Sequence, residues 1–329
     1  HELDDLLRRC VQCGLCLPHC ATWLATGNEV QSPRGRLVLL DGVLRDAAAG
    51  GGAPDRSFLA AFDLCIGCRA CEAACPSGVP YSLLERGQEL AAGARPAAAV
   101  PGFVLRQLDD PGVLGVLESL ARIATRGARL LLGPRWRRLL DGTTFGRLLG
   151  TMPRAPRRDR ELVALLDERT GLTGPWRPPP AADRRDASLA FFRGCANRGL
   201  LPDTSRRLGS LCAAAGFALT DPPGQDCCGA LAAHTDRPGR AARLRGRNRE
   251  AFAAGDGPVP ILVEAAGCAL EMTGYGPDWA ARVTTPATLL ADADLPALAV
   301  VPLRVAVHDP CHARHGLGVV EEPRRLLWR

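Results

Sequence analysis

Two tight runs of cysteines before residue 76 constrain this chain more than any other feature of its sequence. Two residues separate neighbouring members among the first three cysteines of each run, and three residues precede the fourth. The runs are Cys10, Cys13, Cys16 and Cys20, followed by Cys65, Cys68, Cys71 and Cys75. Such spacing is typical of thiolate ligands in a reducing compartment rather than of disulfides. We therefore expect a cytoplasmic protein whose N-terminal fold is built around metal.

The spacing favours iron-sulfur clusters, as in bacterial ferredoxins that hold two cubes. Three thiolates at this spacing can bind three corners of one cube, whereas the fourth points towards the other cube. We therefore expect crossed ligation of two 4Fe-4S clusters. Cluster 1 would be held by Cys10, Cys13, Cys16 and Cys75, and cluster 2 by Cys65, Cys68, Cys71 and Cys20. The alternative is a pair of zinc sites, but zinc commonly takes two close pairs of ligands, which leaves a third cysteine over in each run.

A change of pattern after residue 188 predicts a second kind of fold. Apolar stretches typical of buried strands alternate there with helical patterns, which indicates a parallel sheet covered by helices. In chain order we predict a strand at 189–192, helices at 204–215 and 238–253, and strands at 261–263 and 305–307. Cys195, Cys268 and Cys311 each follow a predicted strand. Ligands collect beyond the carboxyl ends of parallel strands, so we expect these cysteines to converge on one edge of the sheet.

A second candidate metal site lies at this edge. It combines Cys195 and Cys268 with the adjacent pair Cys227 and Cys228, which cannot easily form a disulfide with each other. A glycine follows the pair and lets the backbone approach a bulky ligand. Four thiols at one edge suit a metal ion or a cluster, and the alternative is a set of buried structural cysteines. Cys212 lies among apolar residues in a predicted helix, where we expect it to pack in the core.

The stretch 303–317 resembles 188–200, because both contain an apolar run, a cysteine and a polar turn that ends in Gly-Leu. A second copy of the motif would continue beyond Arg329, so we expect 300–329 to be the start of a truncated second repeat. Cys311 would be a ligand of this incomplete motif. Three neighbouring histidines are either further ligands or part of a solvated turn.

Together these features resemble the iron-sulfur subunits of glycolate oxidase. This family belongs to a larger group with a cysteine-rich CCG domain, which also includes heterodisulfide reductase subunits and the electron subunit of anaerobic glycerol-3-phosphate dehydrogenase. The resemblance is carried by both cysteine runs, by the segment Gln31-Ser-Pro-Arg-Gly-Arg36 and by a CCG domain that begins at Phe191.

The resemblance implies an electron-transfer subunit of a 2-hydroxy-acid oxidase or dehydrogenase that acts on glycolate or D-lactate. A flavin-binding partner subunit would carry the catalytic site, and this chain would pass electrons towards membrane quinone. The sequence agrees, because it has neither a dinucleotide-binding glycine motif after a strand nor a phosphate-binding P-loop. We therefore expect no catalytic residue in this chain.

Two alternatives come from the wider family: disulfide or sulfur chemistry at the CCG site, and the electron subunit of anaerobic glycerol-3-phosphate dehydrogenase. In heterodisulfide reductase relatives the CCG motif ends in two cysteines that are two residues apart. Here Cys268 is followed by Ala269, Leu270 and Glu271. This departure argues against chemistry of the heterodisulfide reductase type.

Arg34 and Arg36 lie at the start of a predicted helix after the first run. They either stabilise a negatively charged cluster or dock the flavin subunit, or they pair with Asp41 or Glu29. Trp23 is expected to pack around a cluster, where a dry shell tunes the reduction potential.

Between residues 122 and 160 the chain carries eleven arginines and two aspartates, a local charge of +9. Arginines mixed with leucines and a tryptophan are typical of a helix at a membrane interface. One expectation is therefore peripheral attachment to the inner face of the cell membrane, and the other is a basic docking face for an acidic flavin subunit. We expect no nucleic-acid partner, since aromatic residues make up only 5% of the chain.

These predictions combine into an α+β chain of four parts. They are a helical two-cluster 4Fe-4S ferredoxin-type unit at 1–98, a basic helical spacer and linker at 99–187, a first CCG domain with a short parallel sheet at 188–299, and the start of a truncated second CCG domain at 300–329. Helical patterns in the first two parts cover 33–46, 56–64, 113–123 and 161–168.

Overall fold

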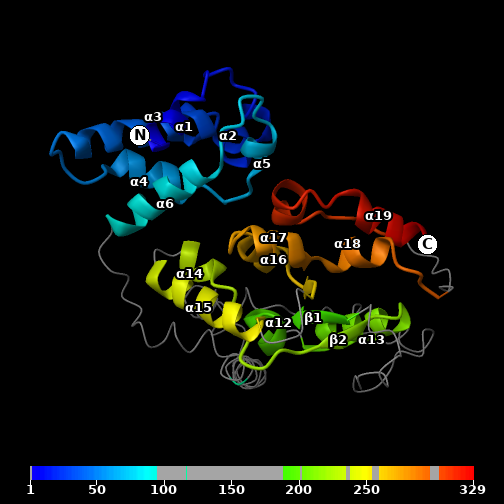
Figure 1. The fold of residues 1–329 in the computed structure, drawn as a ribbon. Coiled ribbons are helices and arrows are strands. Elements are labelled where there is room, and N and C mark those ends of the chain that lie inside the picture. Colours follow the sequence, from blue (N-terminus) through cyan, green and yellow to red (C-terminus); the bar gives the residue numbers. More distant parts are fainter. Residues whose placement is uncertain are drawn as a thin grey trace, which may run out of the picture. The chain divides into compact units, whose positions relative to one another are not determined.

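The computed structural model describes residues 2–94, 116, 188–200, 202–234, 238–253, 259–296 and 304–329, and Figure 1 shows its ribbon coloured along the sequence. The chain divides into two compact units. The first comprises 1–99, 222–292 and 305–329, and the second comprises 100–221 and 293–304.

Some predicted elements lie in parts of the chain that the structure does not describe. The helices at 113–123 and 161–168 and the basic stretch at 122–160 lie outside the described residues, apart from residue 116. Where the structure does describe helices, none combines the length and the hydrophobicity needed to cross a membrane. The boundaries of the four predicted domains stay predictions.

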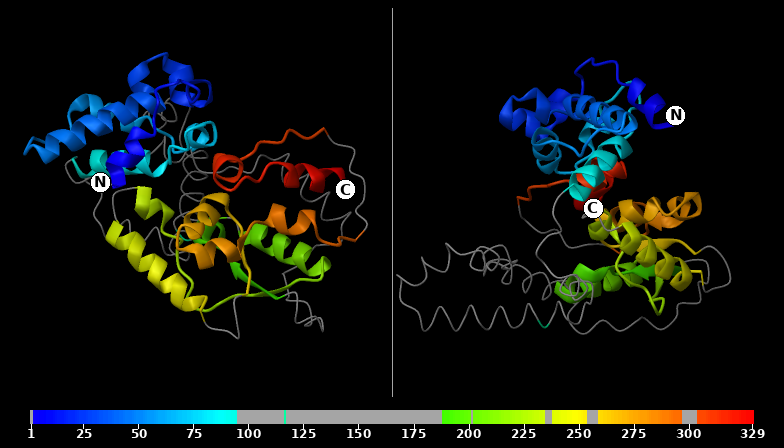
Figure 2. Two further views of the ribbon diagram at one scale, coloured as in Figure 1. Left: turned by 45° about the horizontal axis from the view of Figure 1, so that its top comes forward. Right: turned by 90° about the vertical axis from the view of Figure 1, so that its left-hand side faces the viewer.

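The segment 2–94 has helices as its regular structure, as the sequence predicts. Its elements are α1 (Glu2–Arg8), the 3-10 helix η1 (Leu17–His19), α2 (Ala21–Thr26), the 3-10 helix η2 (Glu29–Gln31), α3 (Pro33–Ala48), α4 (Arg56–Asp63), α5 (Ala70–Ala73) and α6 (Ser82–Gly93). The predicted helices at 33–46 and 56–64 are confirmed by α3 and α4. α3, α4 and α6 pack side by side (Figures 1 and 2).

Side-chain caps explain where α3 and α4 begin. Ser32 accepts a hydrogen bond from the backbone N–H of Gly35 at 3.0 Å, one turn into α3. Asp55 does the same for α4 through the N–H of Phe58 at 2.8 Å. Such a cap is worth about 1 kcal/mol, because it satisfies a backbone donor that the helix leaves free. The sequence therefore fixes both helix starts locally.

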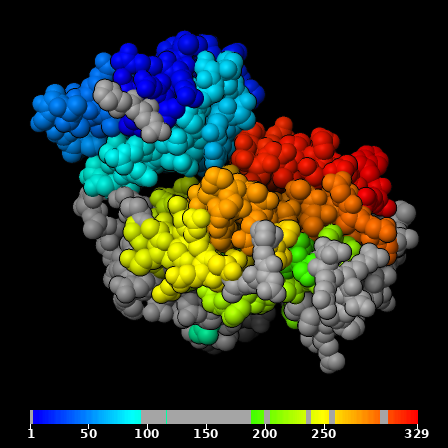
Figure 3. Space-filling view, in the orientation of Figure 1, coloured from blue at the N-terminus to red at the C-terminus, as the bar shows by residue number. Residues whose placement is uncertain are grey.

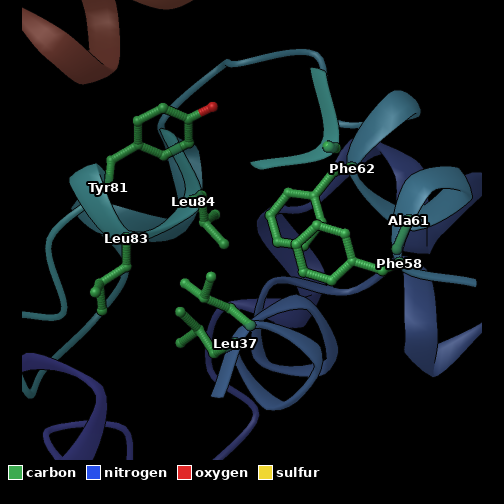
Figure 4. Close-up of a cluster of buried hydrophobic side chains, with 9 residues drawn as sticks. Leu37, Phe58, Ala61, Phe62, Tyr81, Leu83 and Leu84 are labelled. Carbon is green, nitrogen blue, oxygen red and sulfur yellow. The ribbon is translucent and has the colours of Figure 1, made fainter. Parts of the chain in front are cut away.

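Apolar side chains from α3, α4 and α6 form one core (Figure 4). Leu40 and Leu83 are fully buried, and the ring centroids of Phe58 and Phe62 lie 4.5 Å apart. Each side chain of this size stabilises the fold by about 1.5–3 kcal/mol when buried. α6 approaches α4 closely at Gly87, where a Cβ atom would lie 2.1 Å from Phe62 Cε1. In the space-filling view this segment, coloured blue to cyan, forms a contiguous body (Figure 3).

Four short strands form one sheet: β1 (Ser188–Phe192), β2 (Ala218–Thr220), β3 (Ile261–Val263) and β4 (Val283–Thr284), in the order β2-β1-β3-β4. β1 and β2 run parallel with Leu189 opposite Leu219, and β3 and β4 run parallel with Ile261 opposite Val283. The strands predicted at 189–192 and 261–263 are thereby confirmed, and so is the α+β fold class. The sequence does not predict β2 and β4. β2 reads Ala-Leu-Thr and lacks the unbroken apolar run of β3, and β4 has only two residues.

The C-terminal half also contains many helices. They are α12 (Cys195–Leu200), α13 (Pro202–Ala214), α14 (Ala230–His234), α15 (Pro238–Ala251), α16 (Ala266–Thr273), α17 (Pro277–Arg282), α18 (Pro286–Ala291), the π-helical turn η4 (His312–Gly316) and α19 (Glu321–Trp328). α13 and α15 confirm the helices predicted at 204–215 and 238–253.

The strand predicted at 305–307 is wrong. Residues 304–310 form no regular element, and Val305 and Val307 are 62% and 42% exposed. A strand needs a neighbour that takes up its backbone hydrogen bonds. In the sheet that the described residues form, β2 and β4 occupy the two ends, and 305–307 pairs with neither. Cys311 therefore follows an irregular segment instead of a strand.

Candidate iron-sulfur sites

Both N-terminal cysteine runs contain the same turn. Gln12 and Gly67 occupy the same position in their runs, with φ angles of 57° and 69°. Gly14 and Arg69 also correspond, with φ angles of 81° and 59°. Left-handed backbone costs a residue with a side chain about 1–2 kcal/mol, so Gln12 and Arg69 are held there by their surroundings. The shared backbone indicates that both runs are shaped for the same kind of ligand.

One cavity is lined by four of the predicted ligands. Cys20 from the first run lies there with Cys65, Cys68 and Cys71 from the second, which is the set predicted for cluster 2. Burial raises the pKa of Cys71 to about 12, and charges on Cys65, Cys68 and Cys20 add to the rise. Four thiols around a cavity fit a 4Fe-4S cube, whose iron would supply the positive charge that keeps them deprotonated.

The thiols of the first run lie nearer the surface. Cys13 is exposed, whereas Cys10 and Cys16 are half-buried. Burial raises the pKa of Cys16, and the nearby Cys10 and Cys13 raise it further, so these three thiols lie close together. Cys75 accepts a hydrogen bond from the backbone N–H of Val79 at 3.5 Å. The place of Cys75 among the ligands of cluster 1 stays a prediction.

The arrangement of these thiols bears on the zinc alternative. Among the described residues, no group of three or more His, Cys, Asp or Glu side chains is placed to hold a single metal ion. A single zinc ion draws its ligands to within bonding distance of one point. The thiolates of a cube bind separate iron atoms and therefore stand farther apart. The spacing in the sequence, with three thiols two residues apart in each run, favours the cube.

Arg34 and Arg36 have different surroundings. Arg34 pairs with Glu29, one of the two expectations for it, and donates to the carbonyl oxygen of Gln12 at 2.9 Å. Arg36 points inward and is only 1% exposed. Its Nη1 lies 3.8 Å from the Sγ of Cys20. Arg36 is therefore a neighbour of the predicted cluster 2, whereas Arg34 contacts the loop of the first run.

In the CCG region the structure brings Cys228 and Cys268 together, with the Cys228 thiol donating to Cys268 Sγ over 3.1 Å. Asn248 Nδ2 donates to the carbonyl oxygen of Cys227 at 3.0 Å, and the Tyr275 hydroxyl donates to that of Cys228 at 2.6 Å. Cys227 and Cys228 are each 4% exposed. Buried hydrogen bonds therefore hold the adjacent cysteines against α15 and the end of α16.

The pKa of Cys228 lies well above its usual value. A hydrogen bond with Cys227 lowers the pKa, but the hydrogen bond to Cys268 and burial together raise it more. A metal that binds here has to displace a proton from a thiol that holds it firmly.

The remaining cysteines have separate places. Cys195 begins α12 directly after β1 and is half-buried. Cys311 is exposed and precedes the turn η4. Cys212 is fully buried within α13, as expected of a core residue, and burial raises its pKa to about 12. The assignment of Cys195 and Cys311 as ligands stays a prediction.

Sequence reasoning missed three buried polar residues that support these sites. Tyr81 is 2% exposed, and its hydroxyl lies 3.6 Å from Cys65 Sγ. Asn248 and Tyr275 anchor the Cys227-Cys228 backbone, as described above. None of the three belongs to the residue types that commonly bind metal at a recognisable spacing. The one available signal is Asn248, the only polar residue without a charge in the arginine-rich sequence of α15.

Comparisons with known proteins agree with this picture. Residues 6–79 match the 4Fe-4S dicluster domain, and residues 189–273 match the cysteine-rich CCG domain. The chain is 30% identical over 342 residues to the probable glycolate oxidase iron-sulfur subunit of Bacillus subtilis (strain 168), covering 98% of this chain and 74% of that protein. It is 29% identical to the glycolate oxidase iron-sulfur subunit of Escherichia coli (strain K12), over 100% of this chain and 76% of that protein.

A more distant match is a fumarate reductase (CoM/CoB) subunit of Methanothermobacter marburgensis, which is 33% identical over 142 residues, or 42% of this chain and 28% of that protein. No solved structure matches the chain. The dicluster domain and the relatives that match nearly the whole of this chain establish iron-sulfur clusters as the cofactors and electron transfer within an oxidoreductase complex as the role. The chain belongs to the family of glycolate oxidase iron-sulfur subunits.

Proposed function

We propose that this chain takes electrons from the flavin of a partner subunit that oxidises a 2-hydroxy acid, glycolate or D-lactate, and passes them towards membrane quinone. The observation that carries the proposal is the cavity in which Cys20 meets Cys65, Cys68 and Cys71. Such a site joins the two cysteine runs into one electron-carrying unit. The relatives are named as subunits of glycolate oxidase, and we take from these names the oxidase activity of the complex and glycolate as a substrate.

The electron balance supports two clusters in one chain. A reduced flavin returns to its oxidised state by losing two electrons and two protons, and a 4Fe-4S cluster accepts one electron at a time. The protons leave at the partner's flavin site, and a quinone that takes up two electrons and two protons becomes a quinol. This chain's own contribution is to hold the clusters, through Cys10, Cys13, Cys16 and Cys75 for cluster 1 and Cys20, Cys65, Cys68 and Cys71 for cluster 2.

We extend the proposal to the CCG region, where Cys195, Cys227, Cys228 and Cys268 would hold a further cluster or metal ion, with Cys311 as a ligand of the second motif. For location we propose the cytoplasm, with peripheral attachment to the inner face of the cell membrane through the basic stretch 122–160. Arginines near an anionic membrane contribute about 1 kcal/mol each to attachment.

The test starts from the full chain, purified and reconstituted without oxygen. We expect about eight iron atoms in the N-terminal region, four for each cube, and visible absorbance that bleaches when photoreduced flavin is added. A soluble quinone analogue should then restore the absorbance. A colourless protein that retains zinc, or clusters that reduced flavin cannot bleach, would overturn the proposal.

A second candidate function is disulfide chemistry at the CCG site, which the direct contact between Cys228 and Cys268 favours. In that case the reduced protein would cleave a small disulfide, its two electrons and two protons producing two thiols. We expect no such turnover, because Cys268 lacks the second cysteine that follows in relatives with this chemistry. Turnover that disappears in Cys228→Ser would establish this candidate instead.

A further inference from the structure

Arg36 is a charged residue in the core of the N-terminal segment. Its side chain is only 1% exposed, although it begins in the first turn of α3. Nε donates to the carbonyl oxygen of Ala61 at 2.8 Å, and Nη2 donates to Thr22 Oγ1 at 3.0 Å and to Gln31 Oε1 at 3.4 Å. Nη1 points to Cys20 Sγ at 3.8 Å. The first three partners are neutral oxygens.

A buried guanidinium without a counter-charge is costly, by several kcal/mol. Within the described residues no carboxylate forms an ion pair with Arg36, since all its polar contacts are the four just named. A bound cluster would supply the missing charge. The four thiolates of a 4Fe-4S site outweigh the positive charge of its core, so the site is an anion, and reduction adds another negative charge. Arg36 therefore favours the reduced form of the cluster that Cys20 ligates.

Arg34 offers a natural comparison, because it lies two residues away and faces the other run. It contacts the first run through the carbonyl oxygen of Gln12. Its charge is already balanced by Glu29, and its side chain remains 28% exposed. Water and the carboxylate both weaken the field that Arg34 exerts on cluster 1. Arg36 acts from a dry position without a paired carboxylate.

Hydrogen bonds to the cysteine sulfurs also differ between the two predicted clusters. On cluster 2 the buried Arg36 donates through Nη1 to Cys20 Sγ at 3.8 Å. On cluster 1 the corresponding side-chain donor is the exposed amide of Gln12, whose Nε2 lies 3.6 Å from Cys10 Sγ. Net charge, hydrogen bonds to sulfur and solvent exposure are the factors that set cluster potentials. Two of these factors, positive charge and a buried donor to sulfur, are both supplied by Arg36 and raise the potential of cluster 2.

We propose that Arg36 holds the reduction potential of cluster 2 above that of cluster 1, so that an electron entering the chain comes to rest on cluster 2. Cluster 1, with its exposed Cys13, is then the entry point for electrons from the partner subunit. This inference rests on the proposed crossed ligation, which assigns Cys20 to cluster 2. It defines a direction of electron transfer within the chain, from the exposed cluster to the buried one.

The test is a redox titration of the reconstituted full chain, followed by electron paramagnetic resonance, with Cys13→Ser and Cys20→Ser used to assign the signals. We expect the cluster altered by Cys20→Ser to have the higher potential. In Arg36→Gln the equilibrium constant for moving an electron from the other cluster to that cluster should fall at least tenfold. This corresponds to a loss of 59 mV in the potential difference for a one-electron couple. Arg34→Gln should leave the potential of cluster 2 unchanged.

Arg36→Lys keeps the positive charge and is the control for the case in which the glutamine variant misfolds. We expect it to retain most of the potential difference, with the iron content of the parent protein. Equal shifts of cluster 2 in Arg34→Gln and Arg36→Gln, or a higher potential on the cluster that Cys20→Ser leaves intact, would overturn the inference. Failure of the proposed function is recognised separately, because the parent protein would then bind no 4Fe-4S clusters or Cys20→Ser would alter the cluster of the first run.

Discussion

The N-terminal region and the CCG region both gather cysteines, but they hold them differently. In the N-terminal region, four thiols from two distant runs surround a cavity. In the CCG region, Cys228 and Cys268 touch, with one thiol donating to the other over 3.1 Å. The ligands of a cube have to stand around it, whereas thiols in direct contact have to part or share a single ion. In both regions metal binding has to displace thiol protons, since the pKa values of Cys71 and Cys228 are both raised. In the CCG region it also has to break the contact between Cys228 and Cys268.

The supports of the two sites differ as well. Helix caps at Ser32 and Asp55 and a packed apolar core place the N-terminal runs. In the CCG region, buried hydrogen bonds from Asn248 and Tyr275 fix the backbone of the cysteine pair. The N-terminal supports are therefore tested by a change of packing, and the CCG supports by the loss of a buried hydrogen bond. This difference leads to predictions that test each site separately.

The largest effect is expected for Cys20→Ser, because it removes the ligand through which the first run reaches cluster 2. The iron bound in the N-terminal region should fall by up to half, from about eight atoms towards about four, and the lost signal should belong to the cluster of the second run. Iron analysis and electron paramagnetic resonance measure both quantities. Cys75→Ser is the matched control, since crossed ligation predicts that it damages the cluster of the first run. Loss of the nearer cluster in each variant would show that the ligation is not crossed.

The next effect concerns the CCG region. Cys228→Ser should remove the metal bound there and leave the iron of the N-terminal region in place. Cys212→Ser is the control, because Cys212 is also fully buried but lies within α13 as a core residue. Metal analysis after anaerobic reconstitution compares the metal content of the two variants with that of the parent protein. If Cys228→Ser retained as much metal as the parent, the cysteine pair would be structural.

The sequence alone predicted the parts of the fold that have strong local signals. The helices at 33–46 and 56–64 have capping residues and turn signals at their starts, and the strands at 189–192 and 261–263 are unbroken apolar runs. The run 305–307 looks the same in sequence but pairs with no strand among the described residues, and only the tertiary structure reveals that. β2 has the three residues of β3 but includes Thr220 and no unbroken apolar run, and β4 has only two residues, so neither has a signal in the sequence.

For the candidate site as well, the sequence predicts some features and not others. Cysteine spacing predicts eight N-terminal ligands and their crossing, and the structure has Cys20 in one cavity with Cys65, Cys68 and Cys71. The ligand assignment stays a prediction. Cysteine spacing could not separate Arg34 from Arg36, because burial depends on which side of α3 faces the core. Nor could it indicate the left-handed backbone of Gln12 and Arg69, since neither residue type favours that conformation.

A smaller effect is expected from Gly87→Ala in the N-terminal core. The added Cβ atom would lie 2.1 Å from Phe62, so α6 has to shift from α4. Overpacking of this kind costs about 1–3 kcal/mol in free energy of unfolding, which denaturant unfolding of the apoprotein measures. Gly42→Ala is the control, because Gly42 lies on α3 with no atom within 4 Å of the new Cβ, and alanine is the better helix former. Equal stability of both variants would show that the contact between α4 and α6 at Gly87 accepts a methyl group without strain.

The smallest effect is expected from Tyr275→Phe, which tests the polar support of the CCG region. The change removes the hydroxyl that donates to the Cys228 carbonyl oxygen at 2.6 Å and that accepts from Asn248 at 3.3 Å. Because the ring remains and packs against Trp279 with centroids 4.9 Å apart, the loss is confined to these hydrogen bonds. It should cost about 1 kcal/mol of unfolding free energy and weaken metal binding at the CCG site. Tyr81→Phe is the counterpart in the other region and should alter only cluster 2, since the Tyr81 hydroxyl lies beside Cys65. If Tyr275→Phe left CCG metal affinity unchanged while Tyr81→Phe lowered it, the assignment of one polar support to each site would be wrong.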